Sequence, residues 1–231
     1  MEGILNVQAF LRWAATNLHI GSWDNYFATP ANYYLYNSGF DGDAGGFMTK
    51  PYFTFIPWDY DNSFGIDYFD TDWQYTDIVD WPSNTGSYGR ENSGGATSRI
   101  PLVQNLLRNR DFLRYYLDHL EHLLDTDFNP AAIAAAIGTG GLWDRVSQAA
   151  YLESDTPGGQ PFTGRQFSND EVYRSGREQQ ELRRGDTKVE GIIHYVRMRH
   201  DSARTQLAEL RRDHPAGTSG ATFSGTLEPL P

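Results

Sequence analysis

Two aspartates one residue apart follow an apolar run in the segment FIPWDYDNSFG. The run ends at Pro57, and Asp59 and Asp61 come after it, with Trp58 and Tyr60 beside them. Carboxylates at this spacing can share a divalent cation, because hard cations prefer oxygen ligands. The alternative is an ordinary solvated turn, where aspartate is also common. The flanking rings favour a partly buried acid pair, which needs a counter-charge. No Lys or Arg lies nearby in the sequence, so a metal ion is the natural candidate.

Two segments match the calcium-binding loop of an EF-hand in part. Residues 59–70 place oxygen-bearing side chains at positions one, three and five, but their glycine comes one place late and the twelfth residue is aspartate. Residues 41–46 fit the first half of such a loop, whereas the twelfth position is a tyrosine. Both matches to a calcium loop are weak.

Two further polar residues precede this acid pair in the sequence. Asp24 follows a predicted helix, where an aspartate commonly serves in a turn or a helix cap, and Asn32 stands where a strand begins. Together with Asp59, these residues occur along the chain in a particular sequence of features: a loop Asp, an Asn, a hairpin, and a strand followed by acidic residues and Phe-Gly. That order resembles a protein-kinase active site, where catalysis depends on positioning and charge neutralisation.

The elements that would position these residues follow from hydrophobic periodicity. Residues 3–18 predict a buried amphipathic helix, and two β-rich runs predict a hairpin with a long loop. The predicted strands are residues 32–36 and 51–56, and the later predicted helices are residues 100–108, 111–124, 129–138, 142–152 and 187–212. Together these elements predict one mostly helical α+β domain over residues 1–213, with the short hairpin carrying the metal site, and a disordered tail or linker over residues 214–231.

The composition narrows the class of partner. The 231 residues carry a net charge of −11, which disfavours nucleic acid and anionic membranes and favours cations, basic peptides or an anionic ligand carried by metal. The sequence has no cysteine and no apolar run long enough for a transmembrane segment. We therefore expect a globular chain without disulfides, thiolate metal sites or a membrane span.

A specific family resemblance rests on two segments, WDNYFATPANYYLY and FIPWDYDNSFG. They resemble the spore-coat protein H (CotH) kinase family, whose hallmark is a loop Asp, an Asn-aromatic strand and a Pro-Trp-Asp-x-Asp motif that ends in Phe-Gly. Fainter similarity runs through the predicted helices after residue 100, so the resemblance covers about residues 3–212. It implies a diverged, atypical protein-kinase fold that phosphorylates Ser or Thr of secreted or coat proteins, and hence an extracellular, spore or cell-surface location.

The resemblance also implies roles for individual residues. Asp24 matches the catalytic base, and Asn32 and Asp59 match the residues that hold Mg²⁺ or Mn²⁺ with ATP. Asp61 matches the second acid of the family, as a metal ligand or as a support for one. Trp58 and Phe64 are expected to pack behind the metal site.

Two departures from the family pattern accompany these matches. Asn32 comes later after Asp24 than is usual, and residues 28–30 look like an insertion between them. No Gly-rich loop or strand lysine precedes Asp24, so the sequence resembles the C-terminal lobe of a kinase, and we expect a fragment with the N-terminal lobe missing. A different class of function also stays open, in which the acidic stretch of residues 59–80 binds calcium structurally and aromatic residues bind a glycan or a partner.

Overall fold

The computed structural model of the chain describes residues 2–27, 31–37, 52–68, 70–79, 101–138, 140–151, 168–176, 181–184 and 187–217. The elements in these residues are α1 (Val7–Ile20), β1 (Tyr33–Asn37), β2 (Phe53–Pro57), β3 (Ile66–Asp67), a 3-10 helix η1 (Trp73–Tyr75), α3 (Pro101–Leu107), α4 (Arg110–Asp125), α5 (Pro130–Ile137), α6 (Leu142–Tyr151), α7 (Asn169–Ser175), β4 (Glu181–Arg184), β5 (Thr187–Glu190) and α8 (Ile192–Leu210). This mixture of helices and small sheets confirms the predicted α+β class.

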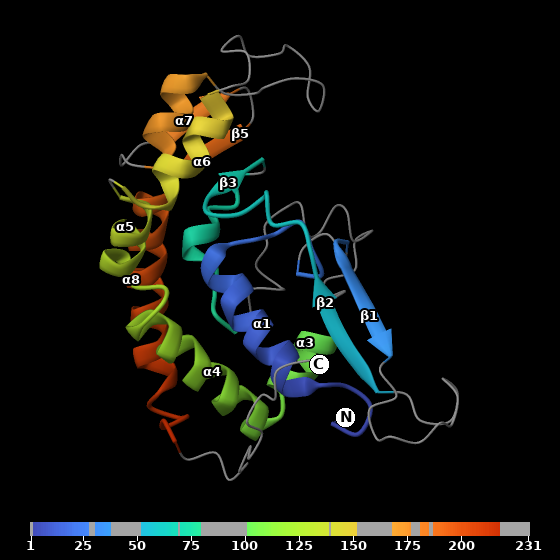
Figure 1. Cartoon of the computed structure of the whole chain (residues 1–231). Helices are drawn as coiled ribbons and strands as arrows, with labels where there is room; N and C mark the ends of the chain where they lie inside the picture. Colours follow the sequence, from blue (N-terminus) through green and yellow to red (C-terminus); the bar gives the residue numbers. More distant parts are fainter. Residues whose placement is uncertain are drawn as a thin grey trace.

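Helix α1 lies between the β1–β2 hairpin and the helices α4 and α8 (Figure 1). The apolar stripe of α1 packs against these neighbouring elements and is buried, as the hydrophobic periodicity predicts. The predicted start at residue 3 is wrong, because Leu5 forms a parallel bridge with Phe53 and the Asn6 side chain then caps the helix that begins at Val7. At the other end Gly21 adopts a left-handed conformation (φ 63°) that turns the chain out of the helix.

Strands β1 and β2 form the predicted antiparallel hairpin, with Tyr33 opposite Pro57 and Asn37 opposite Phe53. One face of the hairpin packs on α1, and Phe55 on that face is buried against the ring of Tyr33. The other face leaves large side chains exposed, because strand residues alternate between the two faces. The exposed side chains of this outer face include Tyr34, Tyr36, Ile56 and Trp58.

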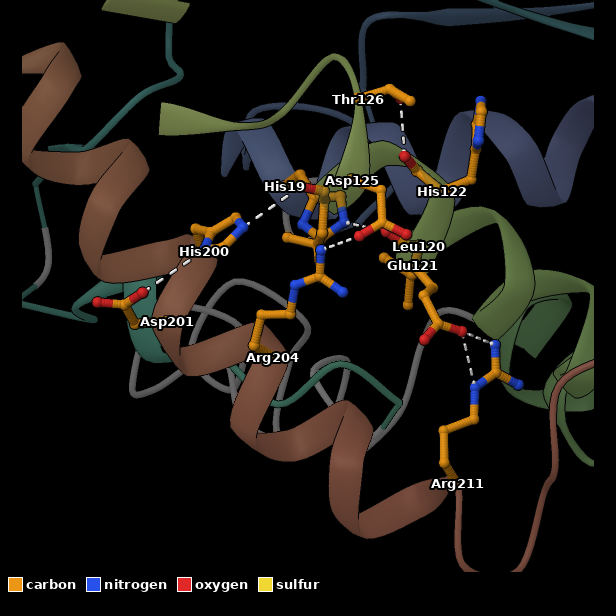
Figure 2. Close-up of polar contacts among 11 residues, drawn as sticks. His19, Leu120, Glu121, His122, Asp125, Thr126, His200, Asp201, Arg204 and Arg211 are labelled. Atoms are coloured by element: carbon orange, nitrogen blue, oxygen red, sulfur yellow. Dashed lines mark hydrogen bonds and ion pairs between the residues drawn. The ribbon is translucent and has the colours of Figure 1, made fainter. Parts of the chain in front are cut away.

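Helices α4 and α8 pack together, and their outer edges are joined by charged pairs (Figure 2). Arg211 donates to Asp118 and Glu121, both at 2.7 Å, and Arg204 pairs with Asp125. Asparagine side chains cap two of the helices in this region, Asn109 at the start of α4 and Asn129 at the start of α5. The sequence places both helices correctly to within a few residues.

The final helix differs from its prediction. Residues 187–190 are not its first turn but the strand β5, which pairs with β4 on one side and with β3 on the other. Val189 sits in the middle of this three-stranded sheet, and Gly191 then provides the entry to α8 at Ile192. The helical pattern was extended too far, because a β-branched residue in a strand also fits an apolar helix position.

An arginine lies in the core at the inner face of α8. Arg199 is fully buried and donates a hydrogen bond of 2.6 Å from Nη1 to the carbonyl oxygen of Thr76, beside η1. Burial lowers the pKa of Arg199. The bond ties the end of the acidic stretch to the helical half of the fold. Among the described residues, no helix combines the length and the apolar character needed to cross a membrane.

Candidate functional site

The open end of the β1–β2 hairpin brings two predicted site residues together. Asn32 directly precedes β1 and Asp59 follows β2 by one residue, so the antiparallel register puts both at the same end. The Trp58 amide donates to the Asn32 carbonyl oxygen at 3.0 Å and extends the ladder past the strands. The sequence therefore predicted correctly that a hairpin would join these two positions.

The loop after α1 lies against the same end of the hairpin. The amide of Phe64 donates to the Ile20 carbonyl at 2.7 Å, and the amide of Trp23 donates to the Asn62 carbonyl at 3.4 Å. Asp24 follows in this loop, and the Asn32 side chain donates from Nδ2 to the Asp24 carbonyl oxygen at 2.7 Å. These bonds hold Asp24 beside the segment that carries Asp59 and Asp61.

Asn62 is a site residue that the sequence reasoning missed. Its Nδ2 donates to the carboxylate oxygen Oδ2 of Asp24 at 3.3 Å, and this bond fixes the direction of the carboxylate from the facing loop. Asn62 lies directly after Asp61 in the segment already singled out. Its polar side chain next to the acids was the available signal.

A network of buried side-chain amides supports the loop that carries Asp24. Asn25 is only 1% exposed, and its Nδ2 donates to Asn17 Oδ1 at 2.9 Å and to the Ser22 carbonyl at 3.1 Å. Its Oδ1 accepts from the Phe27 amide at 3.0 Å. A buried side-chain amide with both ends bonded fixes a single loop conformation. The local sequence does not distinguish Asn25 from an ordinary loop residue, so its burial could not be predicted from the pattern.

The surroundings of Asp61 and Tyr68 raise the pKa of both groups. Partial burial raises the pKa of Asp61, and the nearby carboxylate of Asp59, and more weakly that of Asp24, raise it further. Burial together with Asp61 and Asp24 also raises the pKa of Tyr68. Like charges disfavour one another's ionised form, so these shifts describe a locally negative region that a cation would stabilise.

Left-handed backbone conformations concentrate at this site. Asn32, Asp59 and Phe64 have φ values of 52°, 59° and 53°, and the other described non-glycine residues with positive φ are Asp70 and Asp72. Asn and Asp adopt this region more readily than other residues, whereas an aromatic residue there is strained. Such strain persists only where surrounding contacts impose it and often marks functional positions.

The acid pair is less buried than the sequence argument expects. Asp59 is exposed and Asp61 is mostly exposed, with its carboxyl group only partly buried, so water solvates both without a paired cation. Trp58 does not pack behind the site; it is 46% exposed and stacks on Tyr34 at the outer face of the hairpin, with ring centroids 6.3 Å apart. Phe64 does turn inward, against Tyr195. Flanking aromatic residues were therefore a poor indicator of buried acids.

The acidic stretch beyond the site does receive a counter-charge. Lys188 on β5 lies 2.6 Å from Asp72 and 3.2 Å from Glu190. Burial alone would lower the pKa of Lys188, but the two carboxylates outweigh it and raise the pKa to about 12. Inspection of neighbouring sequence could not find this lysine, because it is 116 residues from Asp72.

The residues present fit a divalent cation in chemical type. Asp59 and Asp61 supply carboxylate oxygens. Asn32 uses its side-chain nitrogen to donate to the Asp24 carbonyl oxygen, and a cation would bind the side-chain oxygen of Asn32 instead. Among the described residues, no three Asp, Glu, His or Cys side chains already stand close enough to hold a metal together. The second calcium-loop candidate, residues 41–46, and the apparent insertion at residues 28–30 lie outside the described residues.

These observations define an α+β chain whose acidic site lies where a post-helix loop meets the end of a hairpin. The family model described as CotH kinase protein matches residues 1–202, and the chain belongs to that family. This confirms the resemblance drawn from the two sequence segments. No curated protein and no solved structure matches the chain.

Proposed function

We propose that this chain forms the catalytic-loop and helical lobe of a CotH-type protein kinase that transfers the γ-phosphate of ATP to Ser or Thr of a protein substrate. The observation that carries the proposal is the meeting of Asp24, Asn32, Asp59 and Asp61 at one end of the hairpin, within a chain of this family. The substrate would be a secreted or coat protein and the site of action extracellular or on a spore or cell surface, as the family implies.

Each of these residues would have a separate role in phosphate transfer. Asp24, held from both sides by Asn32 and Asn62, would orient the substrate hydroxyl and accept its proton. Asp59 and Asn32, with Asp61 as a further ligand or support, would hold Mg²⁺ or Mn²⁺ against the ATP phosphates. When bound, the metal ion neutralises charge on the phosphates during transfer.

The direct test is transfer of labelled phosphate from ATP to a mixed protein substrate, with Mn²⁺ or Mg²⁺ present. We expect transfer by the full-length protein that contains this chain, and a loss of at least about 100-fold when it carries Asp59→Asn, the size typical of a lost electrostatic contact in the transition state. Asp201→Asn is the matched control, because Asp201 lies on α8 with its side chain 84% exposed. Transfer that survives unchanged in Asp59→Asn would contradict the assignment.

A second candidate, a calcium-binding or glycan-binding surface module without catalysis, is favoured by one observation. Tyr34, Tyr36 and Trp58 are exposed on one face of the hairpin next to the acids, and exposed rings suit sugar stacking. Trp73, an aromatic residue of the acidic stretch, is buried against Trp23 and is unsuited to this role. Calcium binding without any response to ATP would support this module over the kinase.

A further inference from the structure

Tyr195, in the first turn of α8, is fully buried and contacts both loops that carry the acid site. One loop follows α1 and holds Asp24, and the other is residues 58–65, which follow β2 and hold Asp59 and Asp61. The hairpin separates these two loops in the sequence. Because Tyr195 lies against both of them from a third element, it is placed to set the distance between them.

The hydroxyl of Tyr195 completes the end of α1. It donates to the carbonyl oxygen of His19 at 3.2 Å. The last carbonyl groups of a helix have no partner within the helix, and an unpaired one is costly when it is buried. The amide of Trp23, which would close a further turn onto His19, donates to the Asn62 carbonyl. The helix end from which the Asp24 loop starts therefore depends on a donor from α8.

The contact between Tyr195 and the Asp24 loop is close and rigid. A Cβ added at Gly21 would lie 2.1 Å from Oη of Tyr195, so a side chain there would displace the tyrosine or the loop. Burial raises the pKa of Tyr195, so its hydroxyl keeps the proton and stays a donor. Helix α8 is itself anchored one turn later, by the bond from Arg199 to the Thr76 carbonyl.

The ring of Tyr195 supports the second loop. It meets the ring of Phe64 edge to face, with centroids 6.2 Å apart and planes at 78°. A Cβ at Gly65 would lie 3.0 Å from Cδ2 of Tyr195. Phe64 has a left-handed backbone (φ 53°), and such a conformation persists only where neighbouring contacts impose it. The ring contact therefore helps to hold the chain that follows Asp61 in its observed conformation.

We propose that Tyr195 is a positioning residue, which holds the Asp24 loop through its hydroxyl and the loop of Asp59 and Asp61 through its ring. Proton acceptance at Asp24 and metal binding at Asp59 depend on a fixed separation, because a displacement of about 1 Å can lower a rate by about 100-fold. The joining of the two loops rests on the contacts alone, whereas its effect on phosphate transfer rests on the proposed function.

Removing the hydroxyl and removing the ring should have different effects in the full-length protein that contains this chain. Tyr195→Phe should lower kcat for phosphate transfer by about tenfold and leave KM for ATP unchanged, because only the Asp24 loop is loosened. Tyr195→Leu should also raise KM for ATP by at least about threefold, because the metal-holding loop then loses its support and binding is weakened. Steady-state kinetics with varied ATP would measure both constants.

Tyr116→Phe is the matched control. Tyr116 is also fully buried, and its hydroxyl donates at 2.8 Å to a backbone carbonyl, that of Ile78, which lies outside both site loops. The two Phe variants should lose stability to a similar extent, whereas only Tyr195→Phe should lose kcat. Replacement of Tyr195 by 4-aminophenylalanine, which restores an N–H donor on the same ring, should recover most of the rate.

Amide hydrogen exchange tests the joining of the loops without nucleotide and without activity. Residues 21–27 should exchange about fivefold faster in Tyr195→Phe than in the wild-type chain, the factor expected from one lost hydrogen bond, and residues 62–66 should change less. In Tyr195→Leu both segments should exchange faster. Tyr116→Phe should change neither segment.

Equal kcat in Tyr195→Phe and Tyr116→Phe, in a wild-type protein that transfers phosphate, would overturn this inference alone. Unchanged exchange of residues 21–27 in Tyr195→Phe would also overturn it, whether or not the protein transfers phosphate. Faster exchange of those residues in Tyr195→Phe, together with no transfer by the wild-type protein, would count against the proposed function alone.

Discussion

The carboxylates of the α4–α8 seam and those of the acid site meet different partners. In the seam, Glu121 and Asp125 lie beside arginines of α8 and of the turn that follows it (Figure 2), and Asp118 lies 2.7 Å from Arg211. At the acid site, no Lys or Arg of the described residues lies within ion-pair distance of Asp59 or Asp61. The described bonds to Asp24 there come from the amide side chains of Asn32 and Asn62.

This difference separates structural acids from acids that are open to a ligand. The seam arginines join two helices that are 90 residues apart in sequence, and their pairing needs nothing from solution. At the site, partial burial and the carboxylates of Asp59 and Asp24 instead raise the pKa of Asp61. The two sets of acids should therefore respond differently to mutation, pH and metal.

The largest effect is expected from the catalytic position. Asp24→Asn should lower kcat for phosphate transfer by about 100-fold to 10,000-fold, because it removes the general base. KM for ATP should change little, since the metal-holding residues remain. Steady-state kinetics with varied ATP would measure both constants, and a rise in KM at constant kcat would show that Asp24 only binds nucleotide.

The next largest effect is expected where the site loop packs on β5. Gly65 has φ 91°, and a Cβ there would lie 2.6 Å from Cβ of Glu190. Gly65→Ala should therefore lower the free energy of unfolding by about 2–4 kcal/mol, from a disfavoured φ and an overpacked contact. Urea denaturation would measure the loss.

Gly3→Ala is the control for that experiment, because an added Cβ at Gly3 meets nothing within 4 Å. Its effect should stay within about 0.5 kcal/mol. Equal effects at the two glycines would contradict the close contact between Gly65 and β5.

A smaller effect is expected in the seam. Asp125→Asn breaks the pair with Arg204, whose side chain is 34% exposed while that of Asp125 is 58% exposed. Exposed ion pairs contribute at most about 1 kcal/mol, so the free energy of unfolding should fall by less than that. The loss should shrink further in high salt, which screens such pairs. A loss of several kcal/mol, measured by urea denaturation, would contradict a purely peripheral role for the seam pairs.

The smallest effect concerns pH at the site. Because the pKa of Asp61 is raised in the folded state, the folded chain binds more protons than the unfolded chain, and stability falls as pH rises through that window. Asp61→Asn should therefore slightly raise the melting temperature at pH 7 without metal, and the gain should disappear at a pH below the ordinary pKa of aspartate. Asp61 is exposed, so the effect is small. Melting curves across pH would show it, and destabilisation at pH 7 would contradict the like-charge account.

Local signals in the sequence predicted a good part of this fold. Asn129 followed by Pro130 marked a helix start, alternating apolar residues marked the hairpin, and the order of Asp24, Asn32 and Asp59 marked the site. The family assignment was confirmed over residues 1–202. The predicted domain boundary at residue 213 and the roles of the four site residues stay predictions.

What the sequence did not predict depends on contacts between distant segments. The pairing of β3 with β5 brings Lys188 to Asp72 across 116 residues, and no local pattern encodes that meeting. The exposure of Asp59 depends on how the hairpin sits against α1, so the neighbouring aromatic residues misled the argument for burial. Arg199 lay in a helical pattern that did not reveal its burial.

The central claim is that the site acids hold a divalent cation together with ATP, and a thermal melt tests it most directly. With Mn²⁺ and ATP at about 100 times their dissociation constant, binding adds about 2.7 kcal/mol of stability. For a chain of this size that corresponds to a rise in melting temperature of about 5–10 °C. We predict this rise for the wild-type chain and for Asp201→Asn, and its absence in Asp59→Asn. A wild-type melting temperature unchanged by millimolar Mn²⁺ with ATP would contradict the claim.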